Sequence, residues 1–273
     1  MRSKKLMDYL VWSRAETAFE KRFALANRLY YHWPISVSWD QECKCYRVSD
    51  AFGSIRTPRV TRVKRYRYGL EARARKIYLE YLLDRISLST GDLVVDCGAN
   101  VGELSLYLGI AHGCDLICVE PDDEEFACLQ ENVKGLNAKV VGQALWCSVG
   151  ELEFYKKNES GDSSLFEVHD YQSKIVVETT TLGQLLSSFG DRRIRLLKLE
   201  AEGAEPEILA GAGETLSRID YIAADVGPER GLRQETTAAS VINFLQKHGF
   251  RLVEISPKRL ICLFESAREP HAA

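Results

Sequence analysis

The residues best suited to chemistry lie where short apolar segments end. In the segment VVDCGANVGE, residues 94–103, Gly98 and Gly102 follow a β-branched run and precede a helix-length stretch. Glycine lets a loop turn tightly and lets its backbone approach a ligand, and the start of a helix adds free N–H donors. Position 100 is Asn, so the segment departs from the dinucleotide motif GxGxxG. It offers instead the carboxylate of Asp96, which can accept a hydrogen bond from an ammonium group.

A second carboxylate ends the next predicted strand. Glu120, in the sequence VEPD, stands 22 residues after Gly98. In Rossmann-like folds a carboxylate at this place accepts hydrogen bonds from the ribose hydroxyls of a nucleotide. Asp96 and Glu120 together therefore predict a ligand that contains adenosine. The plainer alternative is that Asp96 caps the turn and Glu120 only ends a strand.

Several segments together carry a family resemblance. DCGANVGELSLYL, VEPD, the SSL at 163–165 and KLEAEGAEPEIL make residues 90–265 similar to the FkbM family of S-adenosylmethionine (SAM)-dependent O-methyltransferases. The resemblance implies the class I methyltransferase fold and SAM as cofactor. It implies that the methionine part of SAM lies near the glycine loop, its ribose on Glu120, and its adenine beyond the second and third strands. The cofactor-binding residues would be Asp96, Gly98, Asn100, Gly102, Glu120, Pro121, Asp122 and Ala144, the last within Gln143–Leu145.

The segment LLKLEAEGAEPE, 196–207, supplies candidates for catalysis. Side chains alternate along a strand, so Lys198, Glu200 and Glu202 point to one side at its C-terminal end, where open α/β sheets bind ligands. In the family an aspartate commonly stands at position 200. Glu200 or Glu202 could remove the proton of an acceptor hydroxyl, with Lys198 holding the cluster and Asp225, which ends the next strand, as a second candidate base.

Two alternatives apply to these charged residues. They could form a purely structural cluster of paired charges beneath the loop. They could also hold a divalent cation that lowers the pKa of the hydroxyl, but the set lacks a clear third ligand, so we expect no metal. In the polar loop that follows residue 157, Ser163, Ser164 and His169 are the candidates for contact with the acceptor.

The order of the predicted elements is that of a parallel α/β sheet. Strands are expected at 93–97, 116–120, 139–145, 195–200, 221–226, 250–255 and 260–264, the last two as an antiparallel hairpin. Helices are expected at 102–111, 122–134, 206–217 and 237–248. An extra strand pair occupies 151–181. The fold class is thus a Rossmann-like, seven-stranded, mostly parallel sheet, which we divide into an N-terminal extension, 1–90, and a SAM-binding domain, 91–273.

The extension is strongly basic. Residues 1–80 hold 18 Lys and Arg against 8 Asp and Glu, and nine of these cations fall between residues 56 and 76. Such a field attracts phosphates, nucleic acid or an anionic membrane surface. The alternative is a solvated basic face that docks on the acidic remainder. We predict a helical start, a hairpin within 37–49 and a helix over about 71–86.

Composition narrows the class of protein further. Of 273 residues, 45% are apolar and 27% charged, the balance of a soluble globular protein. No segment approaches the roughly 18 to 20 apolar residues of a membrane-spanning helix, and Asp8 interrupts the N-terminus before a signal-like region develops. We expect a cytoplasmic protein, for which peripheral membrane contact through the basic extension stays open. The eight cysteines include no pairs that join histidines at zinc spacing.

The motifs and the resemblance favour an O-methyltransferase whose acceptor is a small molecule or glycan. The resemblance and the basic extension imply a sugar hydroxyl in a glycan or its activated or lipid-linked precursor. An anionic acceptor fits the basic extension. Alternatives are methylation of a polyketide or other natural product, methylation of nucleic acid, a non-catalytic adenosyl-binding scaffold, and an NAD-dependent oxidoreductase. Nucleic acid is disfavoured because the chain lacks the NPPY-type and PC motifs of enzymes that act on a flipped base. The third glycine of a dinucleotide loop is also missing.

Overall fold

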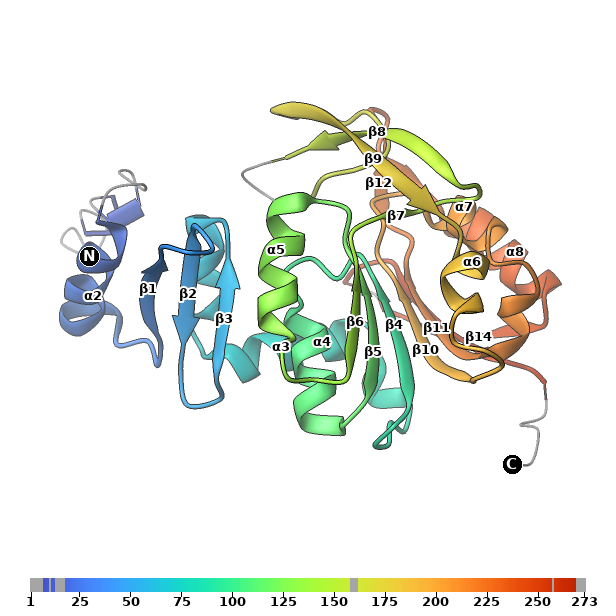
Figure 1. Ribbon diagram of the computed structural model, residues 1–273, viewed down its shortest axis with the longest axis horizontal. Coiled ribbons are helices and arrows are strands. Elements are labelled where there is room, and N and C mark those ends of the chain that lie inside the picture. Colours follow the sequence, from blue (N-terminus) through green and yellow to red (C-terminus); the bar gives the residue numbers. More distant parts are fainter. Residues whose placement is uncertain (1–6, 10, 13–17, 158–161, 257, 269–273) are drawn as a thin grey trace.

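The computed structural model describes residues 7–9, 11–12, 18–157, 162–256 and 258–268. Its centre is a seven-stranded sheet in the order β14-β15-β11-β10-β4-β5-β6 (Figure 1). Four of the six neighbouring pairs are parallel, and β15 runs against both of its neighbours. The predicted fold class and terminal hairpin are confirmed. The strands are β4 Leu93–Cys97, β5 Asp115–Val119, β6 Ala138–Val141, β10 Ile194–Leu199, β11 Ile219–Asp225, β14 Phe250–Ile255 and β15 Ile261–Ser266.

The central strands are mostly apolar because helices cover both faces of the sheet. All five residues of β4 are buried, and its apolar residues on opposite faces belong to different cores. Val94 packs in the core beneath α3 (Leu70–Glu80), α4 (Glu103–Tyr107) and α5 (Asp123–Asn132). Val95 packs in the opposite core, beneath α6 (Leu182–Ser187), α7 (Glu205–Ala210) and α8 (Ala238–Lys247). This sandwich holds the C-terminal ends of the strands at one edge.

Some predicted boundaries were wrong, each for a local reason. The expected strand 139–145 is two strands, because the chain leaves the sheet after β6 and its continuation β7, Ala144–Leu145, pairs with another sheet. The helix expected over 71–86 ends at Glu80, since Leu82 adopts a left-handed conformation before the 3-10 turn Leu83–Arg85. The expected helix 206–217 divides into α7 and the 3-10 helix Gly213–Arg218. The helix at 102–111 continues from α4 as a π-helix, Leu108–His112.

A small sheet stands above the C-terminal edge of the central one (Figure 1). Its strands β8, Gly150–Lys156, and β9, Ser173–Thr180, form the predicted extra pair, and β7 joins β9 in parallel. The loop between β8 and β9 carries the predicted acceptor residues, although residues 158–161 lie outside the described part. A short hairpin of β12, Pro228–Arg230, and β13, Glu235–Thr236, follows β11. These additions lie over the edge where the site was predicted.

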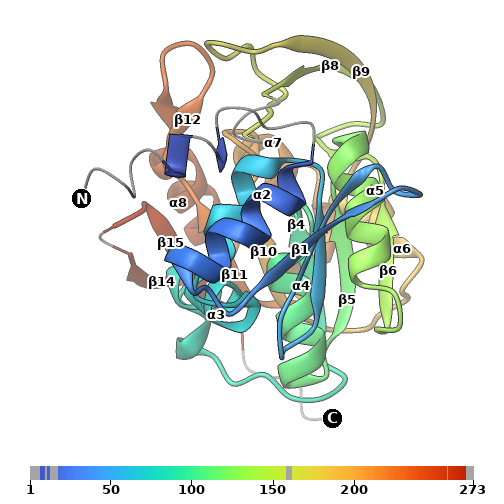
Figure 2. The same cartoon turned by 90° about the vertical axis from the view of Figure 1, so that its left-hand side faces the viewer.

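The N-terminal extension forms a separate layer beside α5 (Figures 1 and 2). It contains α2 (Phe19–Ala26), a π-helix (Asn27–Tyr31), the predicted hairpin as β1 (Ser36–Asp40) and β2 (Cys45–Ser49), and β3 (Ser54–Thr57). Much of the expected helical start lies outside the described residues. Asn132 connects α5 to β3 by two hydrogen bonds. Its Oδ1 accepts from Arg56 N at 2.7 Å, and its Nδ2 donates to Arg56 O at 2.9 Å.

Residues at the end of the extension pack into the hydrophobic core of the central sheet. Tyr81 and Leu83 are fully buried in the same cluster as Val94. The division at residue 90 stays a prediction. Among the described helices, none combines the length and the apolar character needed to cross a bilayer.

Candidate active site

A cleft of about 580 Å³ opens at the C-terminal edge of the central sheet. Its walls come from the ends of β4, β5 and β10, from α3 and the 3-10 helix before it, Val60–Tyr66, and from the loop between β8 and β9. It gathers most of the predicted site residues: Asp96, Gly98, Asn100, Glu120, Pro121, Asp122, Ala144, Ser163, His169, Lys198, Glu200 and Glu202. Gly102, Ser164 and Asp225 lie behind this lining.

The glycine loop is held in a conformation that ordinary side chains resist. Gly98 and Gly102 have φ of 72° and 83°, and Asn100 has φ of 52°. A Cβ on Gly98 would lie 1.9 Å from the carbonyl oxygen of Glu200, so glycine is required there. On Gly102 a Cβ would lie 2.7 Å from a methyl of Leu129. The loop therefore brings bare backbone to the floor of the cleft.

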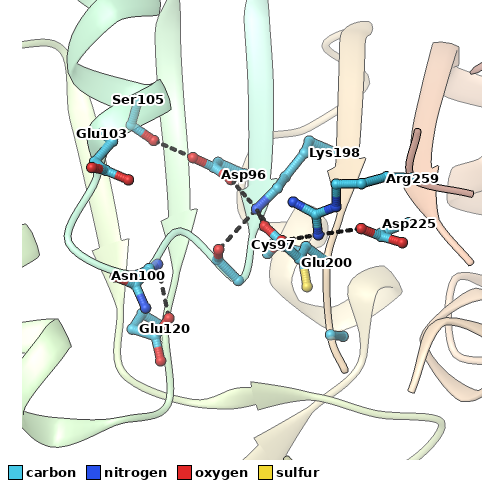
Figure 3. A network of polar contacts seen from close by, with 12 residues as sticks. Asp96, Cys97, Asn100, Glu103, Ser105, Glu120, Lys198, Glu200, Asp225 and Arg259 are labelled. Carbon is cyan, nitrogen blue, oxygen red and sulfur yellow. Dashed lines mark hydrogen bonds and ion pairs between the residues drawn. The ribbon is translucent and has the colours of Figure 1, made fainter. Parts of the chain in front are cut away.

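Glu120 faces the cleft beside this loop and is only 6% exposed. It accepts from the backbone N–H of Asn100 at 2.8 Å and from that of Asp122 at 2.9 Å (Figure 3). Burial nevertheless raises the pKa of Glu120 to about 7. A buried carboxylate that is costly to ionise alone gains from further hydrogen-bond donors, which the two hydroxyls of a ribose supply. Its position fits the predicted ribose contact.

The residues predicted to lie near adenine, Pro121, Asp122 and Ala144, line the cleft. The carboxylate of Asp122 is already engaged, because it caps α5 by accepting from Glu124 N at 3.1 Å and pairs with Lys156 at 3.1 Å. Its part in cofactor binding stays a prediction. Ala144 and Pro121 offer small apolar surfaces against which a flat base could pack.

Asp96 meets an ammonium group, but it is the one of Lys198. Both residues are at most 3% exposed, and their ion pair measures 3.1 Å (Figure 3). The other oxygen of Asp96 accepts from Ser105 Oγ at 2.6 Å. Lys198 Nζ also donates to the carbonyl oxygens of Cys97 and Gly98, at 3.1 and 2.8 Å. These hydrogen bonds connect the glycine loop to Lys198 of β10.

Burial opposes the charge of Lys198, but Asp96 and Glu200 outweigh burial and raise its pKa. The lysine is therefore held in its cationic form and is unsuited to act as a base. This arrangement supports the role of holding the charged cluster together. It leaves Asp96 as the lysine's counter-ion, with both of its oxygens in use.

Glu200 lies between two cations. It pairs with Lys198 at 3.1 Å and with Arg259 at 2.8 Å (Figure 3). Burial would raise the pKa of Glu200, but Lys198 and Arg259 prevail and lower it to about 2. Arg259 also pairs with Asp225, which in addition accepts from Gly227 N at 3.0 Å. Glu200 is therefore a weak base at neutral pH. Burial raises the pKa of Asp225 in spite of its pair with Arg259.

The surroundings of Glu202 and Glu229 differ from those of Glu200, which lies between two cations. Glu202 lines the cleft, and across the described ranges of the chain it forms no ion pair within 4.0 Å. Burial, followed by the charge of Glu229, holds its pKa well above the usual range. Burial, followed by Asp225 and Glu200, raises the pKa of Glu229 to about 8, although Arg259 lies 3.8 Å away. Glu202 also has a left-handed backbone, with φ of 50°, a strain that concentrates at functional sites.

The three loop residues predicted to contact the acceptor differ in position and contacts. Ser163 lines the cleft, and its Oγ accepts from Lys157 N at 3.0 Å. Ser164 is buried, and its hydroxyl donates to the carbonyl oxygen of Glu202 at 3.0 Å, so it positions that residue. His169 lines the cleft and contacts the carbonyl oxygen of Leu232 at 2.9 Å, which joins the loop to the β12–β13 hairpin.

Arg259 and Glu229 are site residues that sequence reasoning missed. Arg259 stands just before β15 and Glu229 within the short strand β12, and both line the cleft. Neither belongs to a motif, and spacing alone does not place them beside Glu200. The available signal was a charged residue directly beyond the end of a predicted core strand, at the edge where the other charges converge.

The alternative of a cation site has no support at the strand ends. In the described part of the chain, the one set of three ligand atoms within 4.8 Å comes from Asp122, Glu124 and Glu125 at the start of α5. Asp122 caps this helix and Glu125 pairs with Arg59. Glu200 and Asp225 have Arg259 between them instead.

Comparison with known proteins identifies related sequences. Residues 96–252 match the family model of the methyltransferase FkbM domain. The 31-O-demethyl-FK506 methyltransferase FkbM of Streptomyces tacrolimicus is 26% identical, over 76% of this chain and 92% of that protein. The 2-O-methyltransferase NoeI of Sinorhizobium fredii is 24% identical, over 61% of this chain and 75% of that protein.

Solved structures give weaker likenesses. The structure of M. capricolum TrmK with S-adenosyl-homocysteine (SAH) is 8% identical with a TM-score of 0.42, covering 72% of this chain and 71% of that one. An rRNA methylase of Streptococcus thermophilus is 12% identical with a TM-score of 0.42, covering 70% and 97%. The family model spans more than half of the chain. The chain belongs to the FkbM methyltransferase family and is a SAM-dependent methyltransferase.

Proposed function

We propose that this methyltransferase acts on a hydroxyl oxygen and that Glu202 is its general base. The observation that carries this proposal is the contrast among the carboxylates at the strand ends. Glu200 is paired with two cations, whereas Glu202 faces the cleft beside Glu229 with a raised pKa. A base works best when its pKa lies near the working pH. The O-methyltransferase names of the two relatives support oxygen as the acceptor atom.

In the proposed in-line displacement, each of these residues has a different role. When bound, SAM supplies an electrophilic methyl group on its sulfonium. Glu202 accepts the proton of the hydroxyl as the oxygen–carbon bond forms, and the sulfur–carbon bond breaks to leave SAH. The negative charge of Glu229 raises the affinity of Glu202 for that proton. Lys198 and Ser164 fix the strand end on which Glu202 stands, which is the positioning that such a reaction needs.

The acceptor that we propose is a sugar hydroxyl in a glycan or its activated precursor. The polar and charged walls of the cleft support it, since Ser163, His169 and Glu229 can hydrogen-bond a polyhydroxyl ligand. A hydroxyl of a polyketide or similar natural product is the second candidate, favoured by the name of the Streptomyces relative. Both acceptors require the same base and the same cofactor position.

A labelled-donor screen tests the proposal. The purified protein is incubated with SAM that carries a deuterated methyl group and with free sugars, nucleotide sugars, oligosaccharides and a macrolide. Mass spectrometry then locates the label. We expect an O-methyl product with a sugar-containing acceptor. Label on nitrogen or carbon would overturn hydroxyl methylation, and label on the macrolide alone would favour the second candidate.

A further inference from the structure

Three arginines gather on the wall of the cleft that the N-terminal extension supplies. Arg62 and Arg65 come from the 3-10 helix Val60–Tyr66 and Arg73 comes from α3, and all three line the cleft. Arg73 binds Glu103 in a bidentate pair, with distances of 3.1 and 2.9 Å. Arg62 donates to the side-chain oxygen of Asn100 in the glycine loop. We call Arg62, Arg65 and Arg73 the arginine cluster.

Arg65 is the member of this cluster without a close counter-ion. Throughout the part of the chain that the structure describes, it forms no ion pair within 4.0 Å, and Glu103 and Asp162 act on it only from further away. Burial lowers the pKa of Arg65, and the neighbouring charge of Arg62 lowers it further. Arg65 is thus a cation that the described residues leave without a close carboxylate. Lys76, one turn beyond Arg73 on α3, also lines the cleft and makes only an exposed pair with Glu80 at 3.4 Å.

The cofactor does not neutralise this wall. SAM carries one carboxylate, one ammonium and one sulfonium, so it brings a net positive charge into the cleft. Its one carboxylate can pair with one of the two loosely paired cations of the wall, Arg65 or Lys76. The other cation then stays available to an anionic group, and the acceptor is the ligand left to supply it.

The residues that the arginine cluster contacts and the residues near the proposed base lie on opposite sides of Lys198. Figure 3 shows Asn100 and Glu103, which the arginines contact, on one side, and Arg259 with Asp225 on the other. Glu229, which we place beside the reacting hydroxyl, lies 3.8 Å from Arg259. An acceptor that spans the cleft would place its hydroxyl at the carboxylates and its other end at the arginines.

We propose that the acceptor carries a phosphate ester or diphosphate, which Arg65 and Lys76 bind on the wall formed by the arginine cluster. Guanidinium groups match phosphate oxygens in geometry and form charge-assisted hydrogen bonds with them. This inference rests on the proposed function, because it names the chemical class of the acceptor at the same site. It makes the N-terminal extension a specificity element of the enzyme.

Calorimetric titration tests the inference without the natural acceptor. The full chain, saturated with SAH, is titrated with inorganic pyrophosphate and, separately, with inorganic phosphate. The variants are Arg65→Gln and Lys76→Gln. The matched control is Arg75→Gln, which removes the same charge from an exposed position of the same helix that does not line the cleft.

We expect pyrophosphate to bind, Arg65→Gln and Lys76→Gln to weaken it about tenfold, and Arg75→Gln to change it less than about twofold. Tighter binding of pyrophosphate than of phosphate supports a diphosphate, and the reverse supports a monoester. The proposal is overturned if neither anion binds, or if Arg75→Gln weakens binding as much as Arg65→Gln. It is also overturned if Arg65→Gln weakens SAH instead, because the cluster would then serve the cofactor carboxylate. Failure of the wild type to bind SAH would contradict the proposed function separately.

Discussion

The two ends of the cleft pair their charges differently. At the cofactor end, around the glycine loop, Asp96 has Lys198 and Ser105, and Lys198 has two carbonyl oxygens and Glu200. At the acceptor end, Glu202 and Glu229 have raised pKa values, and among the residues that the structure describes Glu202 forms no ion pair within 4.0 Å. Charges paired within the protein stabilise its framework, whereas the carboxylate of Glu202 is available to a ligand. Glu120 is the exception at the cofactor end, being buried with a pKa of about 7.

Loss of Lys198 should have the largest effect on stability. Lys198→Met leaves Asp96 as a buried carboxylate without its cation, which costs about 3–5 kcal/mol of the free energy of unfolding. Denaturant unfolding measures this loss. Lys134→Met, at an exposed residue that pairs with Glu131 at 3.5 Å, should cost less than about 1 kcal/mol. Equal stability of the two variants would contradict the structural role of Lys198.

Loss of Glu120 should affect cofactor binding without unfolding the protein. Glu120→Ala removes the acceptor for both ribose hydroxyls, so we expect SAH affinity to fall about 100-fold. Glu124→Ala, at an exposed residue of α5, is the control and should bind SAH as the wild type does. Calorimetry gives both affinities, and circular dichroism checks the fold. Unchanged affinity in Glu120→Ala would separate this residue from the cofactor.

The pH dependence of SAH binding should be smaller but diagnostic. The pKa of Glu120 is raised to about 7, so its carboxylate is ionised above that pH and becomes protonated below it. Affinity should therefore be full at pH 8 and about tenfold lower at pH 6. Titrations at both values, repeated with Glu120→Gln, measure the effect, and the variant should show no such change. A wild type whose affinity does not change with pH would show that another residue holds the ribose.

The sequence predicted the sheet and the glycine loop because both leave a local pattern. Gly98 and Gly102 follow the apolar run of β4 directly, and Glu120 follows β5. The seven strands follow from apolar runs in the sequence. The cofactor contacts of these residues stay predictions.

The acceptor end could not be predicted in the same way because it depends on contacts between distant segments. Arg259 and Glu200 are 59 residues apart, and their pairing decides that Glu200 is a poor base. The sequence left Glu200 and Glu202 equivalent, and only the position of Lys198 and Arg259 separates them. The arginine cluster was visible as a basic segment, but its place on the wall of the cleft depends on how the extension packs.

The rate of methyl transfer in Glu202→Gln tests the central claim most directly. With the acceptor found by the labelled-donor screen, single-turnover rates are measured at saturating SAM for the wild type, Glu202→Gln and the control Glu214→Gln, an exposed residue far from the cleft lining. We predict a loss of about 10²–10⁴-fold in Glu202→Gln alone, with SAH affinity unchanged. A rate within about threefold of the wild type would contradict Glu202 as the base.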